Sequence, residues 1–315
     1  MLQLTQFEYD TATAIHRGRR ERQEDSLATS FPAGTGLGFL VLADGMGGHA
    51  SGDIASKIVV TEVFSELMMQ ANEPEHMEAQ IGEVLREAAY GANECVGQYP
   101  SIRPESAGMG ATLLAPVVFQ DRLYWISVGD SPLFLYRDGQ LRKLNADHSL
   151  APHFDGMVSR GEMDKGQAEN HPDRNCLTSV LIGADIPHID CRSQPLQLKE
   201  SDILVAASDG LTHLSEAEIA ETLNRVDGQK SAEILSALLE ELQALGDPEQ
   251  DNIALCVLRI ARNGHGTKKE TPLSALVGSV ERPVRKSNGN RAGVYAASFE
   301  GAEARRKMVQ GGQGR

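Results

Sequence analysis

Acidic side chains in this sequence recur where strand-like apolar segments end. The stretch "FLVLADGMGGHASGD" (residues 39–53) is an apolar run that stops on Asp44, and four glycines follow within eight residues. The apolar runs of "LYWISVGD" and "DILVAASDG" also stop on an aspartate. In "DPEQDN" an aspartate stands just before the apolar run "IALCVLRI", and "RRERQEDS" offers two acidic residues after an arginine pair. These further stretches contribute, in chain order, Glu24, Asp25, Asp130, Asp209 and Asp251.

Carboxylates gathered at one edge of a core would suit a metal centre. They repel each other and are costly to remove from water, so their pKa values rise unless a cation lies among them. Hard oxygen ligands suit Mg²⁺ or Mn²⁺, and two such ions can share a hydroxide nucleophile. A strand that ends on Asp44 would hold that carboxylate rigidly, and Gly45 would let the backbone approach an ion closely.

A simpler interpretation of the same residues stays open. A single Asp-Gly after a strand is usually just a turn, because both residues tolerate the backbone angles that turns need. Two apolar strands that each end in Asp-Gly could also arise by chance. Composition and spacing alone therefore leave the metal site and ordinary turns as alternatives, and they name no substrate.

The composition limits the class of protein. The chain has 315 residues, with 41% hydrophobic and 23% charged side chains, as is ordinary for a soluble globular protein. No run approaches the roughly 20 apolar residues of a transmembrane segment, and the N-terminus does not resemble a secretory signal. The four cysteines are scattered without a CxxC pair, which predicts free thiols and a cytoplasmic protein. Nothing indicates an oligomer, so we expect a monomer.

The charge is distributed unevenly along the chain. The formal net charge is −14, but residues 263–315 carry a balance of +6 and residues 1–262 a balance of −20. An acidic body argues against nucleic acid as a partner and is compatible with a cation site or basic partners. Residues 8–262 are expected to form one folded domain. Residues 263–315 are rich in glycine and lack periodicity, which predicts a flexible basic tail.

The periodicity predicts an α+β fold with mainly antiparallel sheets. Asp138-Gly139 between two apolar runs indicates a hairpin, and Ser215 with Glu218 has the spacing of a capping box, which predicts a helix start. The order of strands and helices lacks strict βαβ alternation. The expected helices are 54–70, 75–98, one from Ser215, and one over 231–245. The expected strands are 11–16, 38–43, 111–119, 122–128, 133–137, 140–144, 203–207 and 253–260.

Taken together, these motifs resemble the metal-dependent serine/threonine protein phosphatases of type 2C (the PPM family) in their bacterial form. The stretches that carry the resemblance follow in family order over about residues 10–260. They are "RRERQEDS", "LADGMGGHASGDIAS", "SAGMGATLLA", "ISVGDSPLFLYRDGQL", "NADHSL", "NCLTSVLIG", "ASDGLTHLSEAEI" and "DPEQDNIALCVL". The resemblance implies two antiparallel β-sheets stacked face to face with helices outside, an α-β-β-α sandwich. It also implies two Mn²⁺ or Mg²⁺ ions at one end of this sandwich.

Carried over motif by motif, the resemblance assigns roles to individual residues. Asp44 would bridge both ions, the Gly45 carbonyl would bind one, and Asp209 and Asp251 would complete one shell. Asp25 would be a ligand at the metal edge with Glu24 beside it. Asp130, with Asp209, matches the position of a third ion in bacterial members. Arg20, five residues before Asp25, has the spacing of the phosphate-binding arginine, and its planar guanidinium suits a phosphate dianion.

The implied reaction is direct hydrolysis of phosphoserine and phosphothreonine in proteins. A metal-activated hydroxide would attack phosphorus while Arg20 and the ions stabilise the equatorial oxygens. The phosphorylated proteins would be those of a bacterial Ser/Thr kinase. Two alternatives stay open: a phosphatase for one regulatory phosphoprotein, and a pseudophosphatase that binds phosphoproteins without turnover.

Three further features stay as hypotheses. His49 could move a proton or simply order its loop, and His148 is expected to be structural. Residues 151–174 fall where the family carries a mobile flap beside the active site, which would select substrates. Two departures from the family pattern, Gln23 and Pro132, leave the expected metal positions in place.

Overall fold

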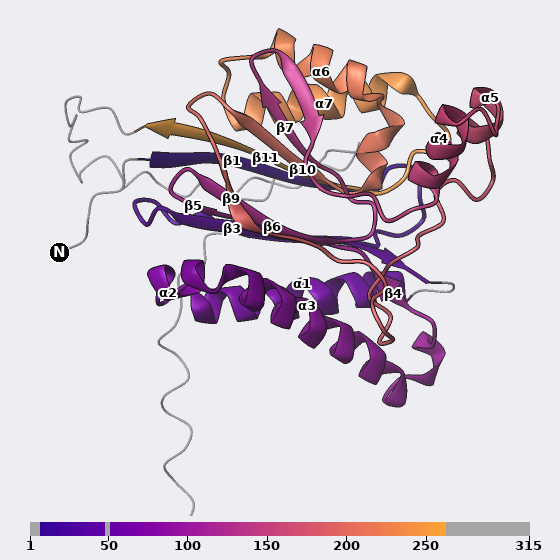
Figure 1. Cartoon of the computed structure of the whole chain (residues 1–315), viewed down its shortest axis with the longest axis horizontal. Helices are drawn as coiled ribbons and strands as arrows, with labels where there is room; N and C mark the ends of the chain where they lie inside the picture. Colours follow the sequence, from indigo (N-terminus) through magenta and orange to yellow (C-terminus); the bar gives the residue numbers. More distant parts are fainter. Residues whose placement is uncertain (1–6, 48–50, 263–315) are drawn as a thin grey trace, which may run out of the picture.

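The computed structural model describes residues 7–47 and 51–262, and these form two β-sheets stacked face to face with helices on both outer sides (Figure 1). The predicted domain 8–262 lies almost wholly within this part. The predicted tail, residues 263–315, and His49 lie outside the described residues.

Both sheets are antiparallel throughout. The first has the order β1-β11-β10-β7-β8, with bounds Phe7–His16, Ile253–Arg262, Ile203–Ala207, Leu133–Arg137 and Gln140–Lys143. The second has the order β2-β3-β5-β6-β9, with bounds Asp25–Ser30, Leu37–Met46, Leu113–Phe119, Arg122–Val128 and Asp190–Gln197. The short strand β4, Gly110–Ala111, also pairs with β3.

Strand β3 is apolar on both faces because it lies between two cores. Leu40 and Leu42 belong to the core between the sheets, which also includes Leu114 and Leu135. Phe39 and its alternate neighbours belong to the core under the helices. A continuous rather than alternating apolar run is the pattern expected for a strand that is buried on both sides.

Two pairs of long helices cover the outer faces (Figure 1). Helices α1 (Gly52–Gln70) and α3 (Ile81–Gln98), with the short α2 (Pro74–Ala79), pack on the second sheet. Helices α6 (Glu216–Arg225) and α7 (Ser231–Leu245) pack on the first. Three 3₁₀ turns complete the described elements apart from α4 and α5: η1 (Tyr99–Ser101), η2 (Pro104–Ser106) and η3 (Asp209–His213).

The fold class and most elements agree with the sequence predictions. Strands β6, β7 and β10 have the predicted bounds, and α6 begins at the predicted capping box. In that box the Glu218 amide donates to the Ser215 hydroxyl oxygen, and the Ser215 amide donates to the Glu218 carboxylate at 2.8 Å. The α+β sandwich is therefore confirmed.

Other elements differ from the prediction. The helix expected over 75–98 is two helices, α2 and α3, separated at Gln80. The strand expected over 111–119 is interrupted at Thr112, whose amide and hydroxyl both bond to the Asp44 backbone. Strands β2 and β9 were not predicted, since β2 is short and rich in small polar residues and β9 is a polar edge strand.

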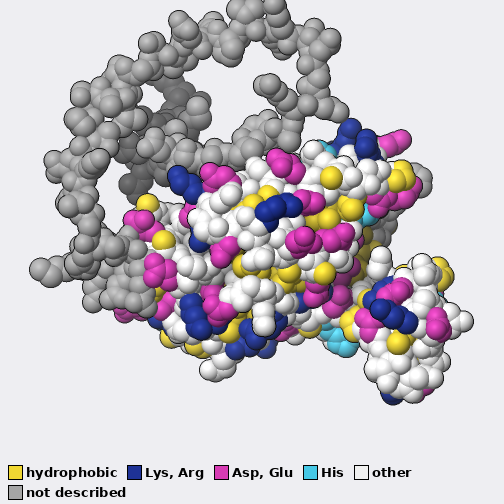
Figure 2. Space-filling model, turned by 90° about the horizontal axis from the view of Figure 1, so that it is seen from above, with side chains coloured by type: hydrophobic (Ala, Val, Ile, Leu, Met, Phe, Trp, Pro, Cys, Tyr) yellow, Lys and Arg dark blue, Asp and Glu magenta, His cyan; other side chains and the backbone are white. Residues whose placement is uncertain are grey.

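Residues 151–174, where a flap was expected, contain helices α4 (Ala151–Ser159) and α5 (Lys165–Glu169). The Phe154 and His171 rings lie 4.1 Å apart between centroids, and Arg174 donates twice to the Asp155 carboxylate. Figure 2 shows this part as a lobe that projects from the rest of the described surface. In residues 7–47 and 51–262, no helix has the length and apolar character needed to cross a membrane.

Candidate active site

Asp25 and Asp44 face each other at the end of the second sheet. They are direct partners in the register of β2 and β3, so the strand pairing sets their spacing. Asp25 is buried, at 4% exposure, and its Oδ2 accepts a 2.7 Å hydrogen bond from the Ser208 hydroxyl. Among the described residues, no partner bonds to its other carboxylate oxygen, Oδ1.

Ser208 joins the two sheets at this end. It follows β10 of the first sheet, and its amide donates to the Ala254 carbonyl of β11 while its hydroxyl accepts from the Ala254 amide, both at 2.9 Å. The same hydroxyl donates to Asp25 of the second sheet. One serine therefore fixes the first sheet relative to a carboxylate of the second.

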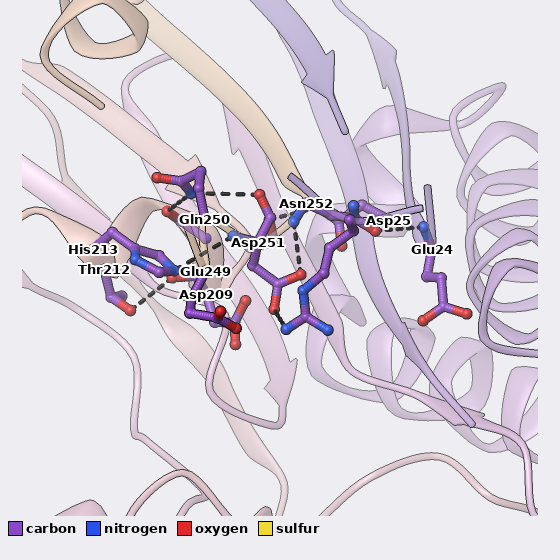
Figure 3. A network of polar contacts seen from close by, with 12 residues as sticks. Glu24, Asp25, Asp209, Thr212, His213, Glu249, Gln250, Asp251 and Asn252 are labelled. Atoms are coloured by element: carbon purple, nitrogen blue, oxygen red, sulfur yellow. Dashed lines mark hydrogen bonds and ion pairs between the residues drawn. The ribbon is translucent and has the colours of Figure 1, made fainter. Parts of the chain in front are cut away.

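Asp209 and Asp251 belong to two loops that lie against each other. Asp209 opens η3, separated from β10 by one residue, and Asp251 precedes β11. A Cβ added at Gly210 would stand only 1.9 Å from the Asn252 carbonyl oxygen, so only glycine permits this approach. The Gln250 side chain also donates to the Gly210 carbonyl at 3.2 Å. Figure 3 shows Asp209 and Asp251 side by side in this network.

Asn252 joins the segment between β1 and β2 to the same loops (Figure 3). Its Oδ1 accepts from the Glu24 amide at 2.7 Å, and its Nδ2 donates to the Arg17 and Arg22 carbonyls at 2.8 and 2.9 Å. The Glu24 carbonyl in turn accepts from the Gly45 amide at 3.1 Å. Glu24, Gly45 and Asp251 are thereby held in one set of backbone contacts.

Asp130 is positioned by the turn that precedes it. Gly129 has a φ of +104°, and a Cβ there would lie 2.6 Å from the Thr112 side chain. His148 holds this turn, because its ring Nδ1 accepts from the Gly129 amide and its own amide donates to the Gly129 carbonyl. The expected structural role of His148 agrees with these contacts.

Arg20 lies beside the carboxylates, in the middle of the β1–β2 connection. Its Nη2 donates to Asp251 Oδ2 at 2.5 Å. The side chain is 58% exposed, so the guanidinium keeps access to solvent while it pairs with Asp251. A fork-shaped cation with free N–H groups is suited to binding phosphate oxygens.

The carboxylates raise one another's pKa values. Burial, with the charges of Asp209 and Asp251, raises the pKa of Asp25 to about 7. Burial, with the charges of Asp209 and Asp147, raises that of Asp130 to about 7. The pKa of Asp44 is held well above its usual range by burial and by four neighbouring aspartates. Their mutual influence means that the fold brings the predicted acidic residues into one electrostatic cluster.

Asp209 and Glu24 belong to the same cluster. Burial and the charge of Asp251 raise the pKa of Asp209, and its interaction with the Asp44 carboxyl partly opposes this rise. The pKa of Glu24 is raised by burial and by Asp53. Asp209 Oδ1, like Asp25 Oδ1, is a buried oxygen that finds no hydrogen-bond partner in the described part of the chain.

These features fit a site for hard divalent cations, since every side-chain donor is a carboxylate oxygen and two buried oxygens have no partner. The side chains do not converge on a single point. Among residues 7–47 and 51–262, no three Asp, Glu, His or Cys side chains form a closed ligand set. The cluster is thus an arrangement of neighbouring carboxylates, with Asp251 turned to Arg20.

A model of the family described as protein phosphatase 2C matches residues 13–254, most of the chain and all of these carboxylates. The chain belongs to this family. It is a serine/threonine protein phosphatase, as the resemblance implied, and family members are metal-dependent hydrolases of phosphoproteins.

Named relatives agree with this assignment. The serine/threonine phosphatase stp of Listeria innocua is 31% identical over 228 residues, which are 71% of this chain and 84% of that protein. PstP of Mycobacterium tuberculosis is 28% identical over 264 residues, which are 82% of this chain and 46% of that longer protein.

Solved structures share the fold. The serine/threonine phosphatase of S. agalactiae has a TM-score of 0.67 at 27% identity, and the match covers 80% of this chain and 99% of that chain. The catalytic domain of PstP, in complex with two manganese ions, has a TM-score of 0.62 at 26% identity, over 81% of this chain and 99% of that chain.

Sequence reasoning found the acidic residues of this phosphatase but missed the polar residues that hold them. Ser208 and Asn252 stand next to Asp209 and Asp251, inside motifs that were recognised, yet no role was given to them. Adjacency to a predicted site residue was the available signal. Which backbone groups an amide or hydroxyl would reach depends on the folded loops.

The pKa shifts predict how stability changes with pH in a chelator. Asp25 and Asp130 have pKa values of about 7 in the folded protein against 3.8 for an ordinary aspartate. Between these values the native state binds more protons than the unfolded state, so the free energy of unfolding should fall as pH rises from about 4 to 7. Denaturant unfolding at several pH values measures this slope.

Asp130→Asn should make the slope shallower, because one titrating group is removed from the native state. The exposed Asp185→Asn is the matched control and should leave the slope as it is. An identical slope in wild type and Asp130→Asn would contradict the assignment of Asp130 to the cluster.

Proposed function

We propose that the carboxylate cluster holds two divalent ions, Mn²⁺ or Mg²⁺, and that its residues act as the sequence motifs imply. Asp44 and the Gly45 carbonyl would bind the ions, Asp209 and Asp251 would complete one shell, and Asp25 would bind at the metal edge. The observation that carries this proposal is the pair of buried oxygens, Asp25 Oδ1 and Asp209 Oδ1, that have no partner among the described residues.

Glu24, Asp130 and Asp209 would have further roles. Glu24, a member of the cluster, would support or join the ligand set. Asp130 and Asp209, each of which raises the pKa of its neighbours, would take part in a third, looser site. Bound divalent ions would supply charge for the phosphoryl oxygens and lower the pKa of water, which provides the nucleophile.

The chain's own groups would bind and orient the substrate. Arg20 would exchange its contact with Asp251 for two parallel hydrogen bonds to the phosphate, since both groups are exposed enough to separate. The strand ends and Ser208 would keep Asp25 and Asp44 fixed during the reaction. Preorganised groups of this kind stabilise a transition state without rearrangement.

We further propose that the protein acts as a cytoplasmic monomer that opposes a bacterial Ser/Thr kinase. The relatives are named as bacterial serine/threonine phosphatases. The four cysteines form no disulfide, and the described ones range from buried to exposed, which suits a reducing compartment.

Asp209→Ala should abolish metal-dependent turnover. The purified protein should hydrolyse a phosphothreonine peptide with Mn²⁺ and not in a chelator. Loss of even an outer partner of a metal ligand costs about 10- to 100-fold, so we expect Asp209→Ala to lower kcat/KM by at least about 100-fold. Steady-state phosphate release measures this.

The matched control is Glu200→Ala, an exposed acidic residue near the opposite end of the strand that leads to Asp209. It should behave as wild type. Turnover that ignores both metal and Asp209 would contradict the proposed site. Tight peptide binding without turnover by the wild type would favour the pseudophosphatase alternative.

The lobe of residues 151–174 would select protein substrates. It projects from the described surface and is held together mainly by its own Phe154–His171 and Arg174–Asp155 contacts. Replacing it with a short linker should lower kcat/KM for phosphoproteins by several-fold or more and spare p-nitrophenyl phosphate. Kinetics on both substrates test this, and equal loss on both would reject the role.

We propose that residues 8–262 are the catalytic domain and that 263–315 form a separate basic tail. Within the described residues, the three core clusters lie between Phe7 and Ile260, almost wholly inside the proposed domain. A chain that ends at Arg262 should keep wild-type melting temperature and peptide kcat/KM. A large loss of either would show that the tail belongs to the domain.

A further inference from the structure

The connection between β1 and β2 carries an unusual density of positive charge. Residues 17–22, here called the arginine loop, have the sequence "RGRRER", with four arginines and one glutamate. Its formal balance is +3, in a part of the chain, residues 1–262, whose balance is −20. This loop is therefore a local concentration of cations within an acidic body.

The arginine loop is fixed to the active site through its backbone. The side-chain Nδ2 of Asn252 donates to the backbone carbonyls at both ends of the loop, those of Arg17 and Arg22. The Arg19 amide donates to the Gln250 carbonyl at 2.8 Å. Gly18 has a φ of +61°, and a Cβ there would lie 2.0 Å from the Asp251 carbonyl oxygen. The loop is therefore built onto the residues that flank Asp251.

Only part of the charge in the loop is neutralised. Arg20 pairs with Asp251, and Arg17 donates to the Glu21 carbonyl, which carries no full charge. The guanidinium groups of Arg19 and Arg22 form no hydrogen bond or ion pair within residues 7–47 and 51–262. All four arginine side chains are exposed.

Three arginines elsewhere in the fold are paired with carboxylates. Arg122, Arg137 and Arg174 each donate two hydrogen bonds to one carboxylate. Acidic partners are thus available to this chain, yet none bonds to Arg19 or Arg22. Arg22 also lies close enough to Glu24 to oppose the rise of that carboxyl's pKa, which places its charge at the edge of the cluster.

We propose that Arg17, Arg19 and Arg22 select phosphoproteins in which acidic residues flank the phosphorylated serine or threonine. This inference rests on the proposed function, because Arg20 of the same loop would bind the phosphate. A substrate whose phosphate is bound by Arg20 would have the residues that flank its phosphorylated serine or threonine beside the guanidinium groups of Arg17, Arg19 and Arg22. Guanidinium groups pair with carboxylates through parallel hydrogen bonds, so acidic flanks match the loop and basic flanks are repelled.

Other anionic or internal partners fit less well. The tail carries a balance of +6, so the loop would repel it. A nucleic acid would extend beyond the loop, where the net charge of −20 in residues 1–262 would repel its phosphates. A short acidic peptide segment held by its phosphate fits better. Its negative charge would pair with the arginine loop, and it is short enough not to extend over the acidic surface beyond the loop.

The size of the effect follows from the exposure of these side chains. Exposed ion pairs are individually weak, about 1.5- to 5-fold each in an equilibrium constant. Two or three of them should therefore give a preference of several-fold to about tenfold, expressed mainly in KM. The preference should shrink at high salt, because exposed charges are screened.

The test compares two phosphothreonine peptides that differ only in their flanks, aspartate and glutamate in one and glutamine in the other. With Mn²⁺ at low salt, kcat/KM of the wild type should be several-fold higher for the acidic peptide. Arg19→Ala/Arg22→Ala should lower this ratio to the smaller preference that Arg17 alone would give. The control Arg142→Ala/Arg192→Ala removes two exposed arginines from β8 and β9 and should keep the wild-type ratio.

The outcomes separate this inference from the proposed function. Metal-dependent turnover with no preference in the wild type, or with a preference that Arg19→Ala/Arg22→Ala retains in full, overturns the inference and leaves the phosphatase activity in place. A preference that does not fall with added salt also overturns it. Absence of metal-dependent turnover on both peptides and on p-nitrophenyl phosphate overturns the proposed function together with the inference.

Discussion

The repulsion among buried carboxylates is the constraint on which the rest of this structure depends. The pKa values of Asp25, Asp44, Asp130 and Asp209 are raised by burial and by the charges of neighbouring aspartates, and Asp25 and Asp209 have buried oxygens without partners in the described chain. A loose arrangement would relax by separating these groups. The fold prevents this by attaching each one to the end of a strand or to a loop with few degrees of freedom, at a cost in stability that enzymes commonly carry at their active sites.

The attachment uses two kinds of contact. Strand pairing sets the spacing of Asp25 and Asp44, and a core of large aliphatic side chains between the sheets keeps the strands in place. A few small polar residues then cross between elements: Ser208 joins the sheets, and Asn252 joins the arginine loop, Glu24 and the strand β11. Such buried polar groups are effective because each has several partners, and losing one partner would leave the others unsatisfied.

The sequence was sufficient to predict what its local patterns determine. Apolar runs such as 122–128 and 203–207 gave strands with correct bounds, and the capping box at Ser215 gave a helix start, because these signals are local. Strand β9 could not be predicted from the sequence because it is a polar edge strand, held by its pairing with β6. The interruption of the strand at Thr112 could not be predicted because it arises from hydrogen bonds to the backbone of Asp44, which is 68 residues away.

The same division applies to the site. Acidic residues at strand ends could be recognised as a possible cluster, but only the family motifs turned that cluster into a phosphatase site. The closeness of Gly210 to Asn252, or of Gly18 to Asp251, could not be predicted, since each is a contact between two loops distant in sequence. A glycine next to an acidic residue suggests a turn, whereas its physical role here is to let two backbones meet.

The charges around the site form a consistent arrangement when cluster and loop are considered together. Negative charge is buried and concentrated, which suits small divalent cations and would repel a phosphoprotein. Positive charge is exposed and lies on a loop whose backbone is fixed beside Asp251. Exposed arginines cost little to leave unpaired, because water solvates them, whereas the same charges inside the cluster would neutralise it. Placing cations only at the rim therefore lets the protein attract an anionic substrate while the carboxylates beneath remain available to metal ions.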